Sequence, residues 1–102
     1  MKHTTLARIA PLLQELRRHH SLREVRPTVF YVNDRDFLHF HDERDGVFAD
    51  VRLARAFVRL PVSTRAEQLE LLGQIDECLS SLDSHMVRRR RRGRDLARGR
   101  RQ

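Results

Sequence analysis

The strongest constraint on the fold is the alternation of apolar and polar residues between Thr28 and Val62. A period of two residues is the repeat of a β-strand with two unlike faces. Residues that favour turns interrupt this alternation, so neighbouring strands are expected to pair as an antiparallel meander. The segment predicts four strands, near residues 28–33, 36–43, 47–53 and 57–62.

Asp45-Gly46 is the strongest turn signal, because both central residues of a type I′ turn need a positive φ. A two-residue turn there pairs Arg44 with Val47. The predicted partners further along the hairpin are His41 with Asp50, Phe40 with Val51, His39 with Arg52 and Leu38 with Leu53. The next turn, at Ala54-Arg55, places Val58 beside Val51 and Arg59 beside Asp50.

This register sorts the side chains onto two faces. The first face is apolar and is expected to carry the helices; it holds Val29, Tyr31, Leu38, Phe40, Ala49, Val51, Val58, Leu60 and Val62. The second face holds Phe30, Val32, Phe37, His39, His41, Phe48, Asp50, Arg52, Phe57 and Arg59. Four phenylalanines are unusual on a solvent face, and two arginines are unusual in a core. We therefore expect something else to meet the second face.

Helical patterns flank the strands. Leu6, Ile9, Leu13 and Leu16 form an amphipathic stripe, within which Pro11 predicts a kink or a helix start just before it. Residues 21–26 are interpreted as a connector. After the strands, Thr64 and Glu67 form a capping-box pattern. The second apolar stripe consists of Leu72, Ile75, Leu79, Leu82 and Met86.

The chain of 102 residues is therefore predicted to be one α+β domain over 1–86, with both helices on one face of a four-stranded meander. A flexible, disordered, Arg-rich tail is expected over 87–102. The single Cys78 is interpreted as a small core residue. With no export signal and no membrane-spanning stretch, we expect a cytoplasmic protein without a membrane partner.

The formal charge of +7 is unevenly distributed. Residues 86–102 hold nine Arg and one Asp, a net charge of +8, whereas residues 1–85 hold twelve basic and thirteen acidic residues, a net charge of −1. This segregation predicts binding of nucleic acid or another polyanion by the tail. The predicted contacts are Arg88, Arg89, Arg90, Arg91, Arg92, Arg94, Arg98, Arg100 and Arg101. Phe48, Arg52 and Arg59 could add contacts to unpaired bases.

Two other functions stay open. Two copies of the second face could bury their phenylalanines in a homodimer, with Asp50 pairing with Arg52 or Arg59 across a two-fold axis. A metal-dependent enzyme could use His39, His41 and Asp50, but Arg52 and Arg59 place positive charge at the same spot. We therefore expect a His41–Asp50 pair without a metal or cofactor. No phosphate loop, nucleophile elbow or HExxH motif occurs, which favours a non-enzymatic protein.

The hairpin resembles the luciferase-like domain family of small uncharacterised bacterial proteins. Their hallmark is a strand of the form hydrophobic-His-Phe-His, matched here by Leu38-His39-Phe40-His41 and followed by Asp50-Val51-Arg52-Leu53. The family pattern continues with a tryptophan in a later strand, and this chain has none. The resemblance implies a compact bacterial α+β domain, and it implies neither established catalytic residues nor light emission.

Overall fold

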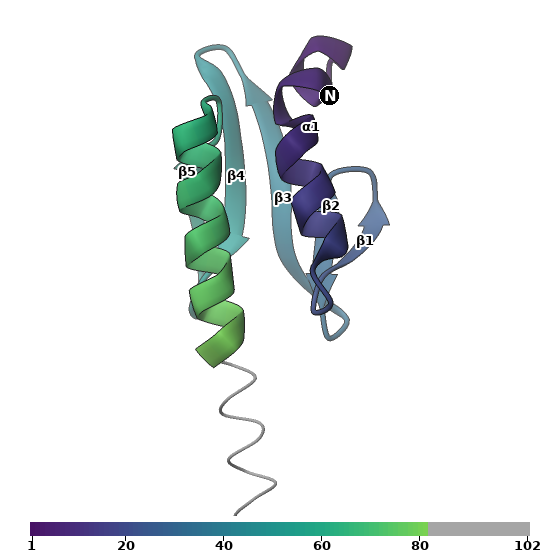
Figure 1. The fold of residues 1–102 in the computed structure, drawn as a ribbon, viewed down its shortest axis with the longest axis vertical. Coiled ribbons are helices and arrows are strands. Elements are labelled where there is room, and N and C mark those ends of the chain that lie inside the picture. The colour runs from purple at the N-terminus through teal and green to yellow at the C-terminus, as the bar shows by residue number, and fades with distance from the viewer. Residues whose placement is uncertain (82–102) are drawn as a thin grey trace, which may run out of the picture.

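Residues 1–81, the part of the chain that this computed structural model describes, form one antiparallel sheet with two helices on a single face (Figure 1). The predicted α+β class is confirmed, but the sheet has five strands in place of four. The elements are α1 (His3–Arg18), β1 (Arg23–Arg26), β2 (Val29–Val32), β3 (Arg35–Glu43), β4 (Gly46–Arg52), β5 (Phe57–Pro61) and a second helix that begins at residue 65. The strand order is β1-β2-β3-β4-β5. The Arg-rich tail, Leu82 and Met86 lie outside the described residues.

The additional strand is β1, in the segment that was interpreted as a connector. It pairs antiparallel with β2 through a turn at Pro27-Thr28, where Thr28 has a φ of 64°. A β-branched residue seldom adopts a positive φ. Here the Thr28 amide donates a hydrogen bond of 3.1 Å to Glu24 Oε2, which stabilises the turn. The strand has four residues and no buried side chain, so the sequence carries little signal for it.

The register of β3 with β4 differs from the prediction by two residues. Glu43 pairs with Gly46, and His39 lies opposite Asp50 while His41 lies opposite Phe48. Neither Arg44 nor Asp45 has a positive φ, so the predicted type I′ turn at Asp45-Gly46 is wrong. A shift of two residues keeps the side chains of the paired residues, 38–43 and 46–51, on their predicted faces, because strand side chains alternate with a period of two. The predicted pairs Val51–Val58 and Asp50–Arg59 are confirmed.

The side chains of β2 point to the opposite faces of the sheet from those predicted. Phe30 pairs with Leu38 and Val29 pairs with His39, so Phe30 points to the helices and Val29 points away from them. The reason is a bulge: Tyr31 pairs with Asp36, which leaves Phe37 of β3 without a cross-strand partner. A bulged residue can direct its side chain to the same face as its neighbour. Phe37 and Leu38 are accordingly both buried.

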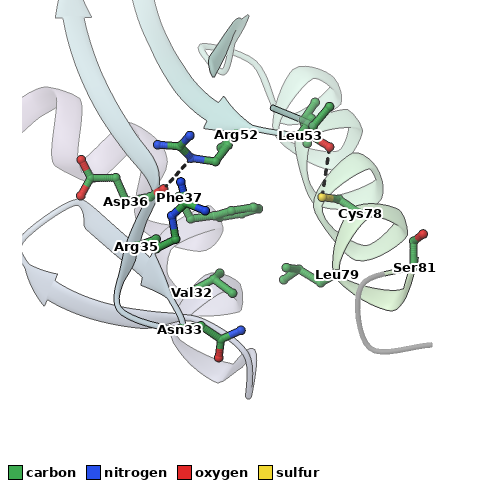
Figure 2. Close-up of a pocket in the computed structure, with 11 residues that line it drawn as sticks. Val32, Asn33, Arg35, Asp36, Phe37, Arg52, Leu53, Cys78, Leu79 and Ser81 are labelled. Carbon is green, nitrogen blue, oxygen red and sulfur yellow. Dashed lines mark hydrogen bonds between the residues drawn. The ribbon is translucent and has the colours of Figure 1, made fainter. Parts of the chain in front are cut away.

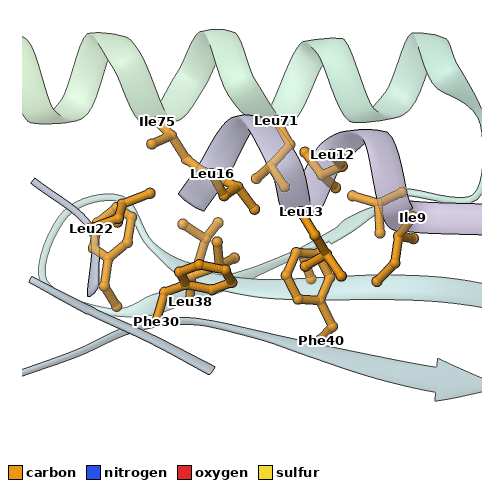
Figure 3. Close-up of a cluster of buried hydrophobic side chains, with 14 of the residues drawn as sticks. Ile9, Leu12, Leu13, Leu16, Leu22, Phe30, Leu38, Phe40, Leu71 and Ile75 are labelled. Atoms are coloured by element: carbon orange, nitrogen blue, oxygen red, sulfur yellow. The ribbon is translucent and has the colours of Figure 1, made fainter. Parts of the chain in front are cut away.

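The core lies between the sheet and the two helices, which run side by side in the same direction (Figures 1 and 3). Figure 3 shows the α1 leucines and the side chains of the second helix meeting the aromatic and aliphatic side chains of the sheet. No buried polar side-chain atom in the described residues lacks a hydrogen-bond partner. The buried hydrophobic residues are Ile9, Leu12, Leu13, Leu16, Leu22, Phe30, Phe37, Leu38, Phe40, Val47, Ala49, Val51, Val62, Leu71, Ile75 and Leu79.

Local signals define both helices. Glu67 Oε1 accepts a hydrogen bond from the Thr64 amide, and Thr64 Oγ1 accepts one from the Glu67 amide, so the predicted capping box is confirmed. Buried Gln68 donates to the carbonyl oxygens of Arg8 and Val62, which ties this helix to α1 and to the end of β5. Helix α1 begins at His3 and continues through Pro11, so the prediction of a start just before Pro11 is wrong. Neither helix in the described range is long and apolar enough to span a membrane.

Candidate functional site on the open face of the sheet

The face of the sheet opposite the helices, here called the open face, carries seven of the nine residues that were predicted for a site on the sheet. No helix or loop among residues 1–81 forms a layer over it (Figure 1). The pairing of His39 with Asp50, and of Asp50 with Arg59, fixes which side chains share this face. They are His39, His41, Phe48, Asp50, Arg52, Phe57 and Arg59.

Two histidines and one carboxylate converge at the centre of the open face. His41 Nε2 lies 2.9 Å from Asp50 Oδ2 and 3.0 Å from His39 Nδ1. His39 Nδ1 lies 3.9 Å from the same carboxylate oxygen. The predicted His41–Asp50 contact is therefore confirmed, although it is a diagonal contact and the direct cross-strand partner of Asp50 is His39. These three residues can offer three ligand atoms to one metal ion.

Arg59 orients the carboxylate of Asp50. Its Nε donates to Oδ1 at 2.8 Å and its Nη2 donates to Oδ2 at 3.1 Å, which is a bidentate pair. These hydrogen bonds are the main reason why the pKa of Asp50 lies below its ordinary value. Arg59 Nη1 also lies 3.3 Å from Glu43 Oε1, so two carboxylates share this guanidinium.

Arg52 is directed away from the histidines. Its Nε donates to the carbonyl oxygen of Asp36, and its guanidinium carbon lies 4.5 Å above the ring of Phe57. Phe57 in turn packs against the His39 ring, with 5.2 Å between the ring centroids. The aromatic side chain therefore separates the cation of Arg52 from the histidines and supports the orientation of His39.

Two residues predicted for this face belong to the core. Phe30 has no exposed surface and Phe37 is 5% exposed, because the β2 register and the bulge turn both toward the helices. Val32 also lies on the helix side, where it lines a pocket with Phe37, while Val29 and Tyr31 belong to the open face. Only Phe48 and Phe57 of the four predicted phenylalanines remain on the open face. Homodimer formation through this face stays a prediction.

A separate pocket of about 520 Å³ lies between the sheet and the second helix, near residue 81 (Figure 2). Phe37, Leu53 and Leu79 line its apolar side, while Arg35 and Arg52 stand at its sheet edge. Cys78 is half-buried here, and its thiol lies 3.3 Å from the Leu53 carbonyl oxygen. Burial raises the pKa of this thiol, which makes Cys78 a poor nucleophile and agrees with the predicted packing role.

No family model, no curated protein and no solved structure matches the chain. The resemblance of the Leu38–His41 strand to luciferase-like domains therefore stays a prediction.

Proposed function

We propose that the protein binds nucleic acid or a similar polyanion through the Arg-rich segment, with Arg88–Arg92 as the central contacts. The observation that carries this proposal is the segregation of charge: residues 86–102 have a net charge of +8 and residues 1–85 a net charge of −1. The guanidinium group of arginine can donate two parallel hydrogen bonds to phosphate oxygens, and each phosphate that is neutralised releases counterions. No enzymatic step is required for this function.

Two arginines at one end of the sheet in the folded domain support the proposal. Arg35 and Arg52 line the same pocket as Ser81, and the chain continues from Ser81 toward the Arg-rich segment. These two arginines therefore add positive charge to the domain near Ser81, the last described residue. Arg59 is not available for phosphate contacts, because its hydrogen bonds go to Asp50 and Glu43. Of the predicted sheet contacts, we retain Arg52 and Phe48.

The first experiment compares two variants of equal net charge. Arg89, Arg90 and Arg91 are changed to Gln in one variant; Lys2, Arg8 and Arg44, which line a pocket at the opposite end of β3, are changed to Gln in the other. Affinity for duplex DNA and single-stranded RNA is measured over a range of salt concentrations. The tail variant should lose about 2 to 3 units of the slope of log K against log salt, since each lost phosphate contact removes about 0.9. The control variant should keep the wild-type slope.

Removal of residues 87–102 is the complementary test. The truncated protein should keep the circular dichroism spectrum of the full chain and lose binding to every sequence, because phosphate contacts carry no sequence information. Phe48→Ala should weaken binding to single strands alone if bases stack on the open face. The proposal fails if the full chain binds neither DNA nor RNA at low salt, or if the two charge-matched variants lose affinity equally.

A further inference from the structure

We propose that His39, His41 and Asp50 form a binding site for one divalent transition-metal ion, with zinc as the best match, at the centre of the open face. This revises the expectation from sequence that the cluster holds no metal. The inference is independent of the Arg-rich segment, because every proposed ligand comes from β3 or β4.

The spacing of the three ligand atoms fits a metal ion. Their separations of 2.9, 3.0 and 3.9 Å define a triangle whose centre lies about 2.0 Å from each atom. Zinc bonds to histidine nitrogen and carboxylate oxygen are about 2.0 to 2.2 Å long. Tetrahedral ligands at that bond length are about 3.3 to 3.4 Å apart. His39 and Asp50 therefore need to approach each other by about half an ångström, and His41 Nε2 needs to move away from both by a similar or smaller amount.

Hydrogen bonds alone satisfy the cluster less well. If His41 Nε2 carries a proton, that one proton has to serve both Asp50 Oδ2 and the lone pair of His39 Nδ1. If the proton is on His39 Nδ1 instead, the bare nitrogen of His41 lies 2.9 Å from a carboxylate oxygen, which is repulsive. One cation at the centre of the triangle attracts all three lone pairs at once.

The positive charge that argued against a metal is compensated. Arg59 is hydrogen-bonded to Asp50 and lies 3.3 Å from Glu43, so these three groups together carry one negative charge. Arg52 is held at the Asp36 carbonyl oxygen and over Phe57. In this arrangement Arg59 orients the carboxylate through hydrogen bonds to both of its oxygens, as outer-shell partners of metal ligands do.

The surroundings leave one side of the site accessible. The side chains of His39, His41 and Asp50 are 31%, 37% and 16% exposed, so an ion can enter and exogenous ligands can complete its coordination. Two histidines and one carboxylate with open positions is the ligand set of catalytic zinc and of non-haem iron sites. Ligands on paired strands are also held more precisely than ligands on loops.

The test uses the full chain, purified in the presence of EDTA and then freed of EDTA. Zinc chloride is titrated by calorimetry, and cobalt chloride is titrated while visible absorption is recorded. We expect one equivalent of zinc per chain, a cobalt spectrum of low coordination number that zinc abolishes, and a higher Tm with zinc. His39→Gln and His41→Gln should each lower zinc affinity by more than about 100-fold, since loss of an outer-shell partner alone costs up to that factor.

His3→Ala and His19→Ala are the controls, and both should bind zinc as the wild type does. His19 is the more stringent control, because its Nε2 lies 3.4 Å from Asp76 Oδ1 and so also presents a histidine beside a carboxylate. Circular dichroism reports whether each variant folds. The proposal is overturned if the wild-type chain shows no saturable zinc binding, if either glutamine variant folds and binds zinc undiminished, or if only His19→Ala loses zinc.

Discussion

Gly46, the first residue of β4, has a backbone conformation and surroundings that favour glycine. Its φ is +147°, and a Cβ built at this position would lie 2.6 Å from Ser63 Oγ. That hydroxyl cannot withdraw without cost, because it accepts a hydrogen bond of 2.9 Å from the Val47 amide. We expect Gly46→Ala to lower the free energy of unfolding by about 1 to 3 kcal/mol, measured by urea denaturation.

Gly73 is the matched control for Gly46. It lies within the second helix, and a Cβ there would meet no atom within 4 Å. Gly73→Ala should therefore raise the free energy of unfolding by about 0.5 to 1 kcal/mol, because alanine loses less conformational entropy in a helix. Equal effects at the two glycines would contradict the account of Gly46.

Among the elements, the bulge in β3 decides which phenylalanines stabilise the core. Phe30 is fully buried beneath the helices, whereas Phe48 lies half-buried on the open face. We expect Phe30→Ala to lower the free energy of unfolding by about 3 to 5 kcal/mol, since it removes a large buried side chain and leaves a cavity. Phe48→Ala should cost less, about 1 kcal/mol, because part of that ring already contacts water. Chemical denaturation of both variants measures the two losses of unfolding free energy. A larger loss for Phe48→Ala than for Phe30→Ala would contradict the burial of Phe30 and favour the β2 orientation predicted from sequence.

At the scale of the whole molecule, the Arg17–Glu24 pair joins α1 to the edge strand β1. Arg17 Nε donates to Glu24 Oε1 at 2.8 Å, and this hydrogen bond is the main reason why the pKa of Glu24 lies below its ordinary value of 4.5. A carboxyl group whose pKa is lower in the folded state stabilises the fold above its unfolded pKa. That contribution is lost as the pH falls through the lowered folded pKa.

Glu24→Gln should therefore reduce the pH dependence of stability between neutral pH and about pH 3, with the folded state less stable than wild type mainly at neutral pH. The effect should be small, because Arg17 is half-exposed and water screens the pair. Urea denaturation across this pH range measures it. Glu77→Gln, at an exposed position of the second helix, should leave the wild-type profile unchanged. The same change in both variants would argue against a role for the pair.

Much of the architecture was predictable, because it depends on local patterns. Thr64 and Glu67 cap a helix through contacts three residues apart, and the period of two in β3 and β4 assigns their faces without any knowledge of partners. The predicted faces of these strands were therefore right for every paired residue from Leu38 onward, and wrong for Phe37 at the bulge, even though the register was wrong by two residues. Much of the candidate site was predictable for the same reason: His39, His41 and Asp50 were all placed on one face, and the contact between His41 and Asp50 was expected.

The tertiary structure alone decided the features that depend on distant residues. Strand β1 forms because the edge of β2 is available for pairing, and the turn between them is stabilised by Glu24, which α1 holds through Arg17. Phe37 leaves the open face for the side of the sheet that the helices cover, where it lines a pocket together with Leu79, a residue far away in the chain. The register that brings both histidines to one carboxylate oxygen differs by two residues from the one that the turn sequence predicted. In this register the Val47 amide donates a hydrogen bond to Ser63, sixteen residues further along the chain, and no local pattern specifies that contact.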